Sequence, residues 1–560
     1  MNQPEPQSIV FPVLMADIEK GLIKIPQFQR EFVWTKEKSA KLLDSMLKGY
    51  PIGTFILWKT KETLRVVRNL GGTKLPDTPR GDFVNHVLDG QQRLTSLFAA
   101  VKGLQIRRED RIDDFSEIYV DLSASTEGDV VTLDVKDKNP KHVVKITDLL
   151  NADLTFLASF PPALHGKLDE YKNRLRTYMF SVVLIKEAPL EVATEIFTRI
   201  NVTGKPLSVF EIMVAKTFDS DRGFDLGEKF TSLIGSLRDV DYESIPSAVL
   251  LQVVAGIISK ECSKKAILRL DKSKVIDEWP SILSAIESTV DHLRTVLRIP
   301  VSKLLPYSSL IVPFAYYFYH HPTKPTGDDA RRLHDLFWRV SLGGRFSFSL
   351  ESRIAQEIKR VDDILAGKQP IYDYPVDTSA EFIKDNGWFS SGRSFVKAIL
   401  CLLAYYQPKS FIDNSIVCIS NDWLKQANSK NYHHYFPKAF LAKKGVEHWK
   451  INHILNITIV DDYLNKREIR DKAPSVYMKK FKKNEHLAET MKTHLIDVEK
   501  FGIWDDDYEL FWKKRAAWIS RELSKRVLQQ TVDEQSQAVN TEDYEDPEID
   551  TTQGYDASND

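Results

Sequence analysis

Apolar and polar positions follow two periods over about the first 216 residues. Runs of apolar residues bounded by turn-forming residues predict three buried strands of a mixed sheet, at positions 55–58, 83–88 and 182–185. Between the first of these runs and the N-terminus, apolar residues recur at helical spacing and predict a helix that begins near Lys36. Its apolar face is formed by Leu42, Leu43, Met46 and Leu47. Residues 1–216 are therefore predicted to form an α/β or α+β domain.

The helical period dominates after residue 217. Longer 3.6-period segments at 248–258, 282–296 and 333–340 predict a helical scaffold domain over 217–377, in which Arg339 and Arg345 are expected to form structural ion pairs rather than to bind phosphate. A third domain is predicted over 378–528. It ends in an amphipathic stretch whose tryptophans are expected in the core: Trp504, Trp512 and Trp518. The chain is therefore predicted to be an α+β multidomain protein.

Length and composition agree with several folded domains. A chain of 560 residues exceeds what one hydrophobic core supports, and its 42% hydrophobic residues can fill more than one. The polar N-terminus and the short apolar runs predict a cytoplasmic protein without a signal peptide or membrane span. Cys262, Cys401 and Cys418 are widely spaced, so we expect buried reduced thiols rather than disulfides or a zinc site.

The formal net charge of −1 conceals an uneven distribution. Residues 531–560 contain about ten acidic side chains and no Lys or Arg, which predicts a disordered, solubilising acidic tail over 529–560. Without this tail the remainder carries a charge of about +9. Residues 425–485 contain about fourteen basic and about six acidic residues. This segment suits a polyanionic partner, although a solvated lysine-rich surface has the same composition.

The first group of residues suited to ligand binding is Asp89-Gly90-Gln91-Gln92-Arg93. It lies between a predicted strand and a predicted helix, where backbone N–H groups and the helix dipole favour an anion. The arginine offers a charged fork for phosphate oxygens, the glutamines can orient a water or a ribose hydroxyl, and the aspartate can hold magnesium or cap the helix. A helix start without any ligand is the alternative.

Two further polar segments accompany this motif. Residues 25–34 read IPQFQREFVW and contribute Gln29 and Arg30. Residues 197–207 read FTRINVTGKPL, contain Asn201, and lead into a helix capped by Ser208 with Glu211 in capping-box spacing. The sequence contains no GxxxxGK[ST] motif, which excludes a P-loop NTPase.

These three motifs, in this order, resemble the ParB/sulfiredoxin-like N-terminal domain of GmrSD-type modification-dependent (type IV) restriction enzymes. The resemblance covers about the first 215 residues. It implies nucleotide binding, with GTP or ATP as ligand and hydrolysis in several relatives. The nucleotide-binding residues that it implies are Asp89, Gly90, Gln91, Gln92, Arg93, Gln29, Arg30 and Asn201.

A second constellation comprises His433-His434, Asn456 and Asn465. A histidine at a hairpin followed by two asparagines is the order used by ββα-metal nucleases. Such chemistry needs a neutral imidazole to deprotonate water and a hard divalent cation to stabilise the phosphate. Basic residues that can neutralise phosphates follow nearby: Lys466, Arg467, Lys472 and Lys480.

This constellation resembles the HNH nuclease domain that is fused to such N-terminal domains. The resemblance implies that His434 is the general base, that His433 and Asn465 bind Mg²⁺ or Mn²⁺, and that Asn456 braces the loop. His433 replaces the carboxylate of many relatives, which favours manganese or nickel over magnesium. His453 is expected at the surface. A histidine pair without catalytic role, or a zinc site from these three histidines, is the alternative.

Together these features predict a nucleotide-regulated, metal-dependent DNA endonuclease of a restriction or anti-phage defence type. The predicted partners are phage or modified DNA and a nucleoside triphosphate, with no membrane. A homodimer is left open. The alternative is a non-catalytic DNA-binding regulator, or an NTPase whose HNH domain is degenerate.

Overall fold

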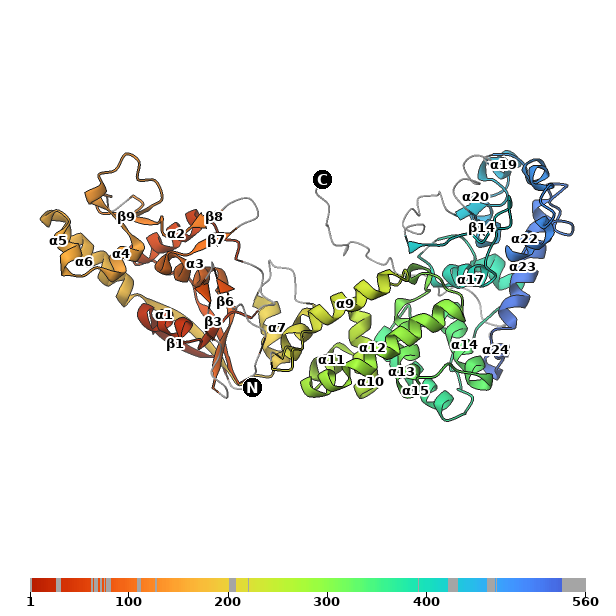
Figure 1. Ribbon diagram of the computed structural model, residues 1–560, viewed down its shortest axis with the longest axis horizontal. Coiled ribbons are helices and arrows are strands. Elements are labelled where there is room, and N and C mark those ends of the chain that lie inside the picture. Colours follow the sequence, from red (N-terminus) through yellow and green to blue (C-terminus); the bar gives the residue numbers. More distant parts are fainter. Residues whose placement is uncertain are drawn as a thin grey trace. The chain divides into compact units, whose positions relative to one another are not determined.

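The computed structural model describes residues 3–26, 32–61, 64, 69–70, 73–74, 76, 82–107, 112–125, 128–200, 208–219, 221–390, 392–421, 432–460, 469 and 471–535. The chain divides into two compact units, 1–226 and 227–560 (Figure 1). Both combine helices with small sheets, which confirms the predicted α+β class. The boundaries predicted at 216/217, 377/378 and 528/529 stay predictions.

The first unit is built on a five-stranded mixed sheet with the order β1-β12-β3-β6-β2. Its strands are Glu5–Val10 (β1), Met179–Lys186 (β12), Phe55–Thr60 (β3), Val84–Asp89 (β6) and Ile23–Lys24 (β2). The pairs β12–β3 and β6–β2 are parallel, whereas β1–β12 and β3–β6 are antiparallel. The three strands predicted from apolar runs correspond to β3, β6 and β12, which confirms that prediction.

Helices and minor strands surround this sheet (Figure 1). The helices are Phe11–Glu19 (α1), Lys36–Leu47 (α2), Gln91–Lys102 (α3), Ile146–Asn151 (α4), Leu154–Ala158 (α5), Pro162–Thr177 (α6), Leu190–Ile200 (α7) and Val209–Thr217 (α8), with a 3-10 turn at Pro140–His142 (η1). The minor strands are Asn69–Leu70 (β4), Thr73–Lys74 (β5), Gln105–Arg107 (β7), Ile112–Asp114 (β8), Tyr119–Asp121 (β9), Val131–Thr132 (β10) and Val143–Lys145 (β11).

One hydrophobic core joins the sheet to the helices α1, α2, α3 and α6. The four apolar residues predicted on one face of the second helix are all buried in this core. Side chains of β3, β6 and β12 complete it, which shows why these strands are rich in large apolar residues. The prediction of a helix from Lys36 is thereby confirmed.

The second unit is mainly helical. Its first helices are Leu226–Arg238 (α9, which begins on the last residue of the first unit), Ser247–Ser259 (α10), Lys264–Arg269 (α11), Lys272–Thr295 (α12), Ile311–His320 (α13), Gly327–Leu342 (α14) and Leu350–Leu365 (α15), with 3-10 turns at Ser302–Leu304 (η2) and Ser308–Leu310 (η3). Helix α13 packs against α10, α12 and α15, and its residues 311–318 are all buried. The predicted helical segments correspond to α10, α12 and α14.

A small antiparallel hairpin of Tyr432–His434 (β13) and Ile457–Ile459 (β14) lies in the later part of this unit. Around it lie Ala380–Asn386 (α16), Ser394–Tyr405 (α17), Lys438–Lys443 (α19), His448–Ile451 (α20), Ile454–Asn456 (η4), Pro474–Tyr477 (α21), Met478–Phe481 (η6), Leu487–Thr493 (α22), Tyr508–Ser524 (α23) and Thr531–Gln535 (α24). Helix α17 packs against β14, and α23 packs against η4 and α16. Trp512 is buried as predicted, whereas Trp504 and Trp518 are only half-buried.

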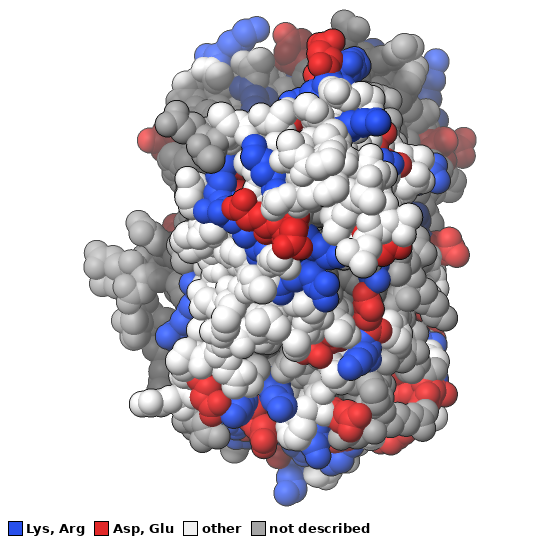
Figure 2. All heavy atoms as spheres, turned by 90° about the vertical axis from the view of Figure 1, so that its left-hand side faces the viewer, with Lys and Arg blue, Asp and Glu red and all other residues white. Residues whose placement is uncertain are grey.

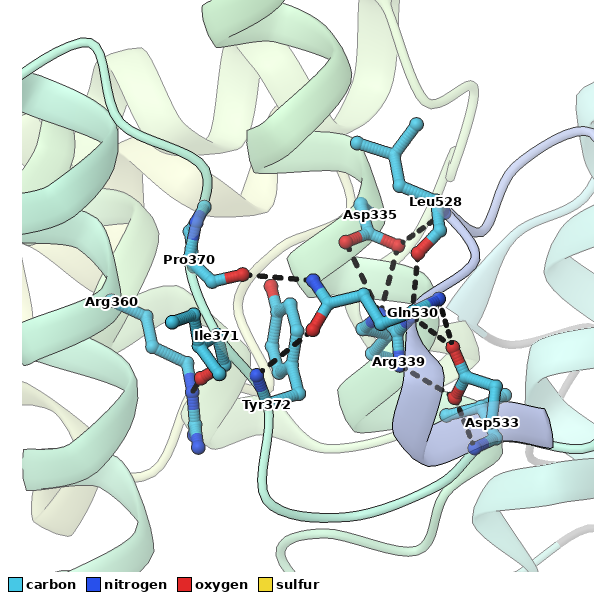
Figure 3. Close-up of polar contacts among 10 residues, drawn as sticks. Asp335, Arg339, Arg360, Pro370, Ile371, Tyr372, Leu528, Gln530 and Asp533 are labelled. Carbon is cyan, nitrogen blue, oxygen red and sulfur yellow. Dashed lines mark hydrogen bonds and ion pairs between the residues drawn. The ribbon is translucent and has the colours of Figure 1, made fainter. Parts of the chain in front are cut away.

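The C-terminal segment is fixed to α14 by a buried ion pair (Figure 3). The Arg339 guanidinium donates to Asp335 at 3.1 Å and to the Asp533 carboxylate at 2.9 and 2.5 Å. The structural ion pairs predicted for Arg339 and Arg345 are confirmed, since Arg345 binds Glu357. The predicted acidic tail needs a correction, because its first part forms α24 and buries Asp533.

Two other predictions can be compared with the described residues. Cys262 and Cys401 are buried as expected, but Cys418 is exposed, because it lies between the buried Val417 and Ile419 of a non-helical segment and points to the opposite side. None of the helices in the described ranges combines the length and the apolar character that crossing a bilayer requires.

Candidate functional site

The DGQQR motif forms the turn between β6 and α3, as predicted. Strand β6 ends at Asp89, and the register between β3 and β6 shifts beside it, because Ile56 pairs with Asp89 while Leu57 pairs with Val87. Gly90 has a φ of 92°, a left-handed conformation that favours glycine. A Cβ atom there would also overlap the Phe55 ring. The helix start is therefore pressed closely against β3.

Arg93 binds the turn that precedes β3. Its Nη1 donates to the Ile52 carbonyl at 2.7 Å, and its Nη2 donates to the Thr54 carbonyl and the Asp89 carboxylate, each at 3.0 Å. The guanidinium also lies 5.3 Å from the centre of the Phe55 ring. Asp89 thus pairs with Arg93 and makes no capping hydrogen bond to α3. The roles expected for both residues toward a nucleotide stay predictions.

Gln92 connects this motif to the segment that follows the predicted Gln29 and Arg30. Its Oε1 accepts hydrogen bonds from the backbone N–H groups of Val33 at 2.9 Å and Trp34 at 3.3 Å. Its Nε2 donates to Oε1 of Gln91 at 3.0 Å. Both glutamines are buried, so the pair holds residues 33–34 against the start of α3.

The third motif begins on α7, which packs against β6. The capping box predicted before α8 is present, with the Glu211 backbone N–H donating to the Ser208 hydroxyl and Glu211 accepting from the Ser208 backbone N–H. Gln29, Arg30 and Asn201 lie outside the described residues. The described parts of the first two motifs therefore follow the parallel strands β2 and β6 at the same end of the sheet, and the third motif begins on a helix that packs against β6. On the face that carries α5 and α6, acidic and basic side chains are interspersed (Figure 2).

The second constellation centres on His434, at the end of β13. Its Nε2 lies 3.0 Å from Oδ1 of Asn452. The Asn452 Nδ2 donates to the Phe389 carbonyl at 3.3 Å, which fixes the orientation of the amide. Oδ1 must then accept, so Nε2 carries the imidazole proton and Nδ1 carries the lone pair. Burial, together with the nearby Lys438, lowers the pKa of His434 to about 4. This imidazole is therefore neutral at pH 7.

Asn456 braces the chain around this histidine. Its Oδ1 accepts from the Phe436 N–H at 2.8 Å, and its Nδ2 donates to the carbonyls of Phe436 and Ile451 at 2.9 and 3.0 Å. The side chain is fully buried. Beneath it, the buried Arg515 donates to the Leu455 carbonyl at 2.7 Å and to the His494 carbonyl at 3.0 Å. These contacts hold the loops on both sides of the hairpin.

His433 occupies the neighbouring position of the same strand. Successive side chains of a strand point to opposite faces. Accordingly the His433 ring packs edge-on against Tyr477, whereas His434 faces Asn452. The described residues do not bring together three His, Cys, Asp or Glu side chains that fit a metal ion. The donors present around the hairpin therefore do not by themselves fit a hard divalent cation, and Asn465 lies outside the described residues.

The prediction that His453 lies at the surface is wrong. Its side chain is fully buried, its Nδ1 accepts from the Leu455 N–H at 3.1 Å, and its Nε2 lies 3.2 Å from the Lys384 carbonyl. Burial lowers its pKa to about 3. The ring caps η4 and packs at 4.3 Å on Trp512. Its two nitrogens are thus used by the backbone, which contradicts the alternative of a zinc site.

The predicted phosphate-binding residues are only partly described. Lys480 is exposed on η6, and Lys472 is half-buried before α21. Lys466 and Arg467 lie outside the described residues. Other exposed lysines of this region lie on or directly after short helices around the hairpin: Lys438, Lys443, Lys479 and Lys482.

Asn452 and Arg515 were not anticipated from the sequence. Asn452 stands four residues before Asn456, in a segment where the conspicuous polar residue was His453. A polar residue before a 3-10 turn has no distinct sequence pattern, so the contact of Asn452 with His434 could be recognised only in the structure. Arg515 interrupts the apolar face of α23, and that interruption is the signal that points to a buried charge.

Comparison with known proteins places these motifs in context. Residues 13–218 match the sequence profile of the family described as GmrSD restriction endonuclease, N-terminal domain. The matched range includes all three motifs of the first unit. An uncharacterized protein of Methanocaldococcus jannaschii is 25% identical over 554 residues, which cover 86% of this chain and 90% of the relative. The similarity to this relative therefore extends across both units.

Proposed function

We propose that this chain is a nucleotide-regulated DNA endonuclease of restriction or anti-phage type, because residues 13–218 match the family described as GmrSD restriction endonuclease, N-terminal domain. The hairpin of β13 and β14 is its proposed HNH catalytic centre, and the β6–α3 turn its nucleotide site. Foreign or modified DNA is the proposed substrate.

The observation that carries the proposal is the hydrogen bond between His434 and Asn452. It leaves Nδ1 of a neutral imidazole as a base at the end of a hairpin, and Asn456 fixes the following backbone. A general base must be unprotonated and held in one orientation, and both conditions are met at neutral pH. The exposed lysines nearby give the region the positive charge that a phosphodiester requires.

In the proposed reaction, Nδ1 of His434 takes a proton from a water molecule. The resulting hydroxide attacks phosphorus in line with the 3′ oxygen, so that one P–O bond forms while the other breaks. The 3′ oxygen takes a proton from solvent, and the products carry a 5′ phosphate and a 3′ hydroxyl. Asn452 keeps the imidazole oriented throughout and supports the positive charge on it through its amide oxygen.

The proposal includes a divalent cation, Mg²⁺ or Mn²⁺, because HNH nucleases use one. His433 and Asn465 are its expected ligands. No step above depends on the cation, since the described donors do not form its site.

Regulation is proposed to begin at the β6–α3 turn. Arg93 joins this turn to residues 52 and 54, and Gln92 joins it to residues 33 and 34. GTP or ATP bound at this turn would change these contacts together. A ligand shifts a conformational equilibrium only through different contacts in its two states, and this network offers such contacts.

Cleavage of plain plasmid and modified phage DNA tests the proposal, with Mg²⁺ or Mn²⁺ and with or without GTP or ATP. We expect metal-dependent cutting that nucleotide alters. His434→Ala should abolish cutting while DNA binding persists, and His448→Ala, at an exposed histidine of α20, should cut like the wild type. Cutting that survives His434→Ala would contradict the assignment of the base.

A DNA-binding regulator with an inactive nuclease fold is the second candidate. It is favoured by the donor set, because His433 is an imidazole where a carboxylate is usual and the described neighbours add no cluster of metal ligands. Folded protein that binds DNA but does not cut under any of these conditions would select this function.

A further inference from the structure

An exposed tryptophan, Trp388, precedes Phe389, whose carbonyl binds the side chain of Asn452 beside the proposed base. The Trp388 side chain is 42% exposed, although tryptophan is usually covered in folded domains. The Arg393 guanidinium lies 3.4 Å from the centre of its ring, which is a close cation–π stack. Arg393 is itself fixed, because its Nη1 donates to the carbonyls of Asn386 at 2.7 Å and Trp388 at 3.3 Å. The pair therefore forms a flat and rigid surface.

Backbone contacts connect this surface to His434. Trp388 forms an isolated antiparallel bridge with His453. The next residue, Phe389, donates its N–H to the Asn452 carbonyl at 2.9 Å, and its own carbonyl accepts from the Asn452 side chain. Asn452 in turn binds the imidazole of His434. Phe389 thus connects Trp388 to Asn452, the residue that orients the proposed base.

The chemistry of this surface suits a nucleobase. Aromatic rings stack on bases of any sequence, and an arginine adds a favourable contact with the same ligand. Within a fully paired duplex, both faces of every internal base are covered by neighbouring bases. An exposed tryptophan can stack only on a base that is single-stranded, bulged or turned out of the helix.

We infer that Trp388 and Arg393 form a stacking platform for an unpaired base next to the phosphate that faces His434, so that the substrate class is DNA with a locally unpaired base. This inference rests on the proposed function, because DNA is taken as the ligand. It adds a preference for DNA with an unpaired base, which neither the family nor the proposed cleavage reaction requires.

Binding without cleavage tests the platform. The full chain is titrated in EDTA against two fluorescein-labelled duplexes of the same sequence, one fully paired and one with a single bulged 2-aminopurine. Anisotropy reports affinity, and the fluorescence of 2-aminopurine reports stacking, because stacking quenches it. We expect tighter binding of the bulged duplex and quenching of its 2-aminopurine.

Three variants make the test specific. Trp388→Leu keeps an apolar side chain without a ring and should weaken binding of the bulged duplex by about five- to about a hundredfold, with loss of quenching. Trp388→Phe should keep both. Trp504→Leu is the matched control, because Trp504 is half-buried and stacked by Lys482 at 4.4 Å, and its indole N–H donates to Glu499. This control should retain the preference for the bulge.

The outcomes separate this inference from the proposed nuclease activity. Preference and quenching that persist in Trp388→Leu, or a wild type that binds both duplexes equally, would overturn the platform even if DNA is cut. A preference that depends on Trp388 in a protein that never cuts would support the platform and reject the nuclease. If Trp388→Leu does not fold by circular dichroism, Arg393→Gln replaces it, and an unchanged preference in that variant would equally overturn the inference.

Discussion

Nε2 of His434 donates a hydrogen bond of 3.0 Å to Oδ1 of Asn452. The second bond of this amide, to the Phe389 carbonyl, prevents it from turning over. The pair thus selects one tautomer of a half-buried imidazole and directs the other nitrogen away from the protein amide. In a nuclease centre this contact determines which atom acts as the base.

Replacing Asn452 is expected to change the acidity of His434. Asn452→Asp places a carboxylate beside Nε2, which raises the pKa of the imidazole from about 4 toward neutrality. The wild-type rate should fall only below about pH 4, whereas the variant should lose rate at distinctly higher pH. Asn452→Ala should lower the cleavage rate about ten- to hundredfold at pH 7 by releasing the ring. The pH–rate profiles of the three proteins check this.

The matched control for this prediction is Asn484→Asp. The Asn484 Nδ2 also donates to a backbone carbonyl, that of Phe411, but its side chain has no role in the proposed reaction. Its profile should follow the wild type. Identical acid limbs for wild type and Asn452→Asp would show that Asn452 does not act on the base.

The local chemistry of the motifs could be predicted from the sequence better than their connections. Apolar patterns identified β3, β6, β12 and α2, because the predicted apolar runs lie in largely buried parts of the strands and the helix buries one apolar face. The turn at Gly90 and the cap at Ser208 follow from short-range chemistry. The bonds of Arg93 to residues 52 and 54 join positions about forty residues apart, and no local pattern encodes them.

Burial was the property that the sequence revealed least. His453 and Cys418 have opposite exposures from those predicted, since the neighbours of a single polar or small residue do not determine whether its side chain points to the core or to solvent. Asp533 belongs to a segment whose acidic composition predicts disorder. It is nevertheless buried, because it pairs with Arg339 of α14, which lies much earlier in the chain. Such pairings depend on tertiary structure alone.

Buried histidines are expected to make the fold sensitive to acid. Burial lowers the pKa of His494 from 6.5 to about 4. His453, His434, His292 and His334 are lowered for the same reason. Between pH 6.5 and the lowered values, the unfolded chain binds protons that the folded chain does not, so stability falls as pH falls. Each histidine should cost about 1–2 kcal/mol between pH 7 and pH 5.

Urea unfolding at pH 7 and pH 5 measures this effect. His494→Gln keeps a donor toward the Lys409 carbonyl but cannot titrate, so its stability should fall less between the two pH values than that of the wild type. His448→Gln, at an exposed position, should leave the difference unchanged. Asp335 works in the opposite direction, because burial raises its pKa to about 6, and burial also raises the pKa of Asp17 and Glu357. These carboxyl groups are the same in His494→Gln and wild type, so they cancel in the comparison. Equal slopes for His494→Gln and wild type would contradict the assignment.

Gly53 and Gly49 offer a matched pair for the nucleotide turn. Both have positive φ, 88° and 78°, so alanine strains the backbone at either position by about 1 kcal/mol. A Cβ on Gly53 would overlap Nη1 of Arg93, whereas a Cβ on Gly49 meets open space. Gly53→Ala should therefore displace the guanidinium from the carbonyls of Ile52 and Thr54, and Gly49→Ala should not.

We expect Gly53→Ala to lower the affinity for GTP or ATP at least about tenfold and Gly49→Ala to leave it unchanged. Isothermal titration with each nucleotide measures this, and unfolding of the two variants corrects for the shared strain. Equal nucleotide affinities in both variants would remove Arg93 from the nucleotide site. A nucleotide that binds neither variant nor the wild type would reject the site as a whole.

Asp533 and Glu534 allow the C-terminal anchor to be tested. Asp533 is 5% exposed and pairs with Arg339, whose guanidinium also binds Asp335 and the Leu528 carbonyl (Figure 3). Without Asp533, Arg339 keeps Asp335 as a buried carboxylate partner, but the guanidinium and the backbone N–H groups of Val376 and Gln530 lose their acceptor, and buried donors left unsatisfied typically cost about 1–3 kcal/mol. Asp533→Ala should therefore destabilise the second unit by about this amount, whereas Glu534→Ala, at the exposed neighbouring position, should change stability by less than about 0.5 kcal/mol.

Two truncations extend this test to the acidic region that follows. A chain that ends after Gln535 keeps α24 and the ion pair but loses most of the acidic residues, so its unfolding should match the full chain. A chain that ends after Val527 loses Leu528, Gln530 and Asp533 together and should unfold at much lower urea, because Arg339 is then left with Asp335 alone among these partners. Equal stability of both truncations would mean that the second unit does not need this anchor. Destabilisation of the chain that ends after Gln535 would instead assign a structural role to the acidic residues beyond α24.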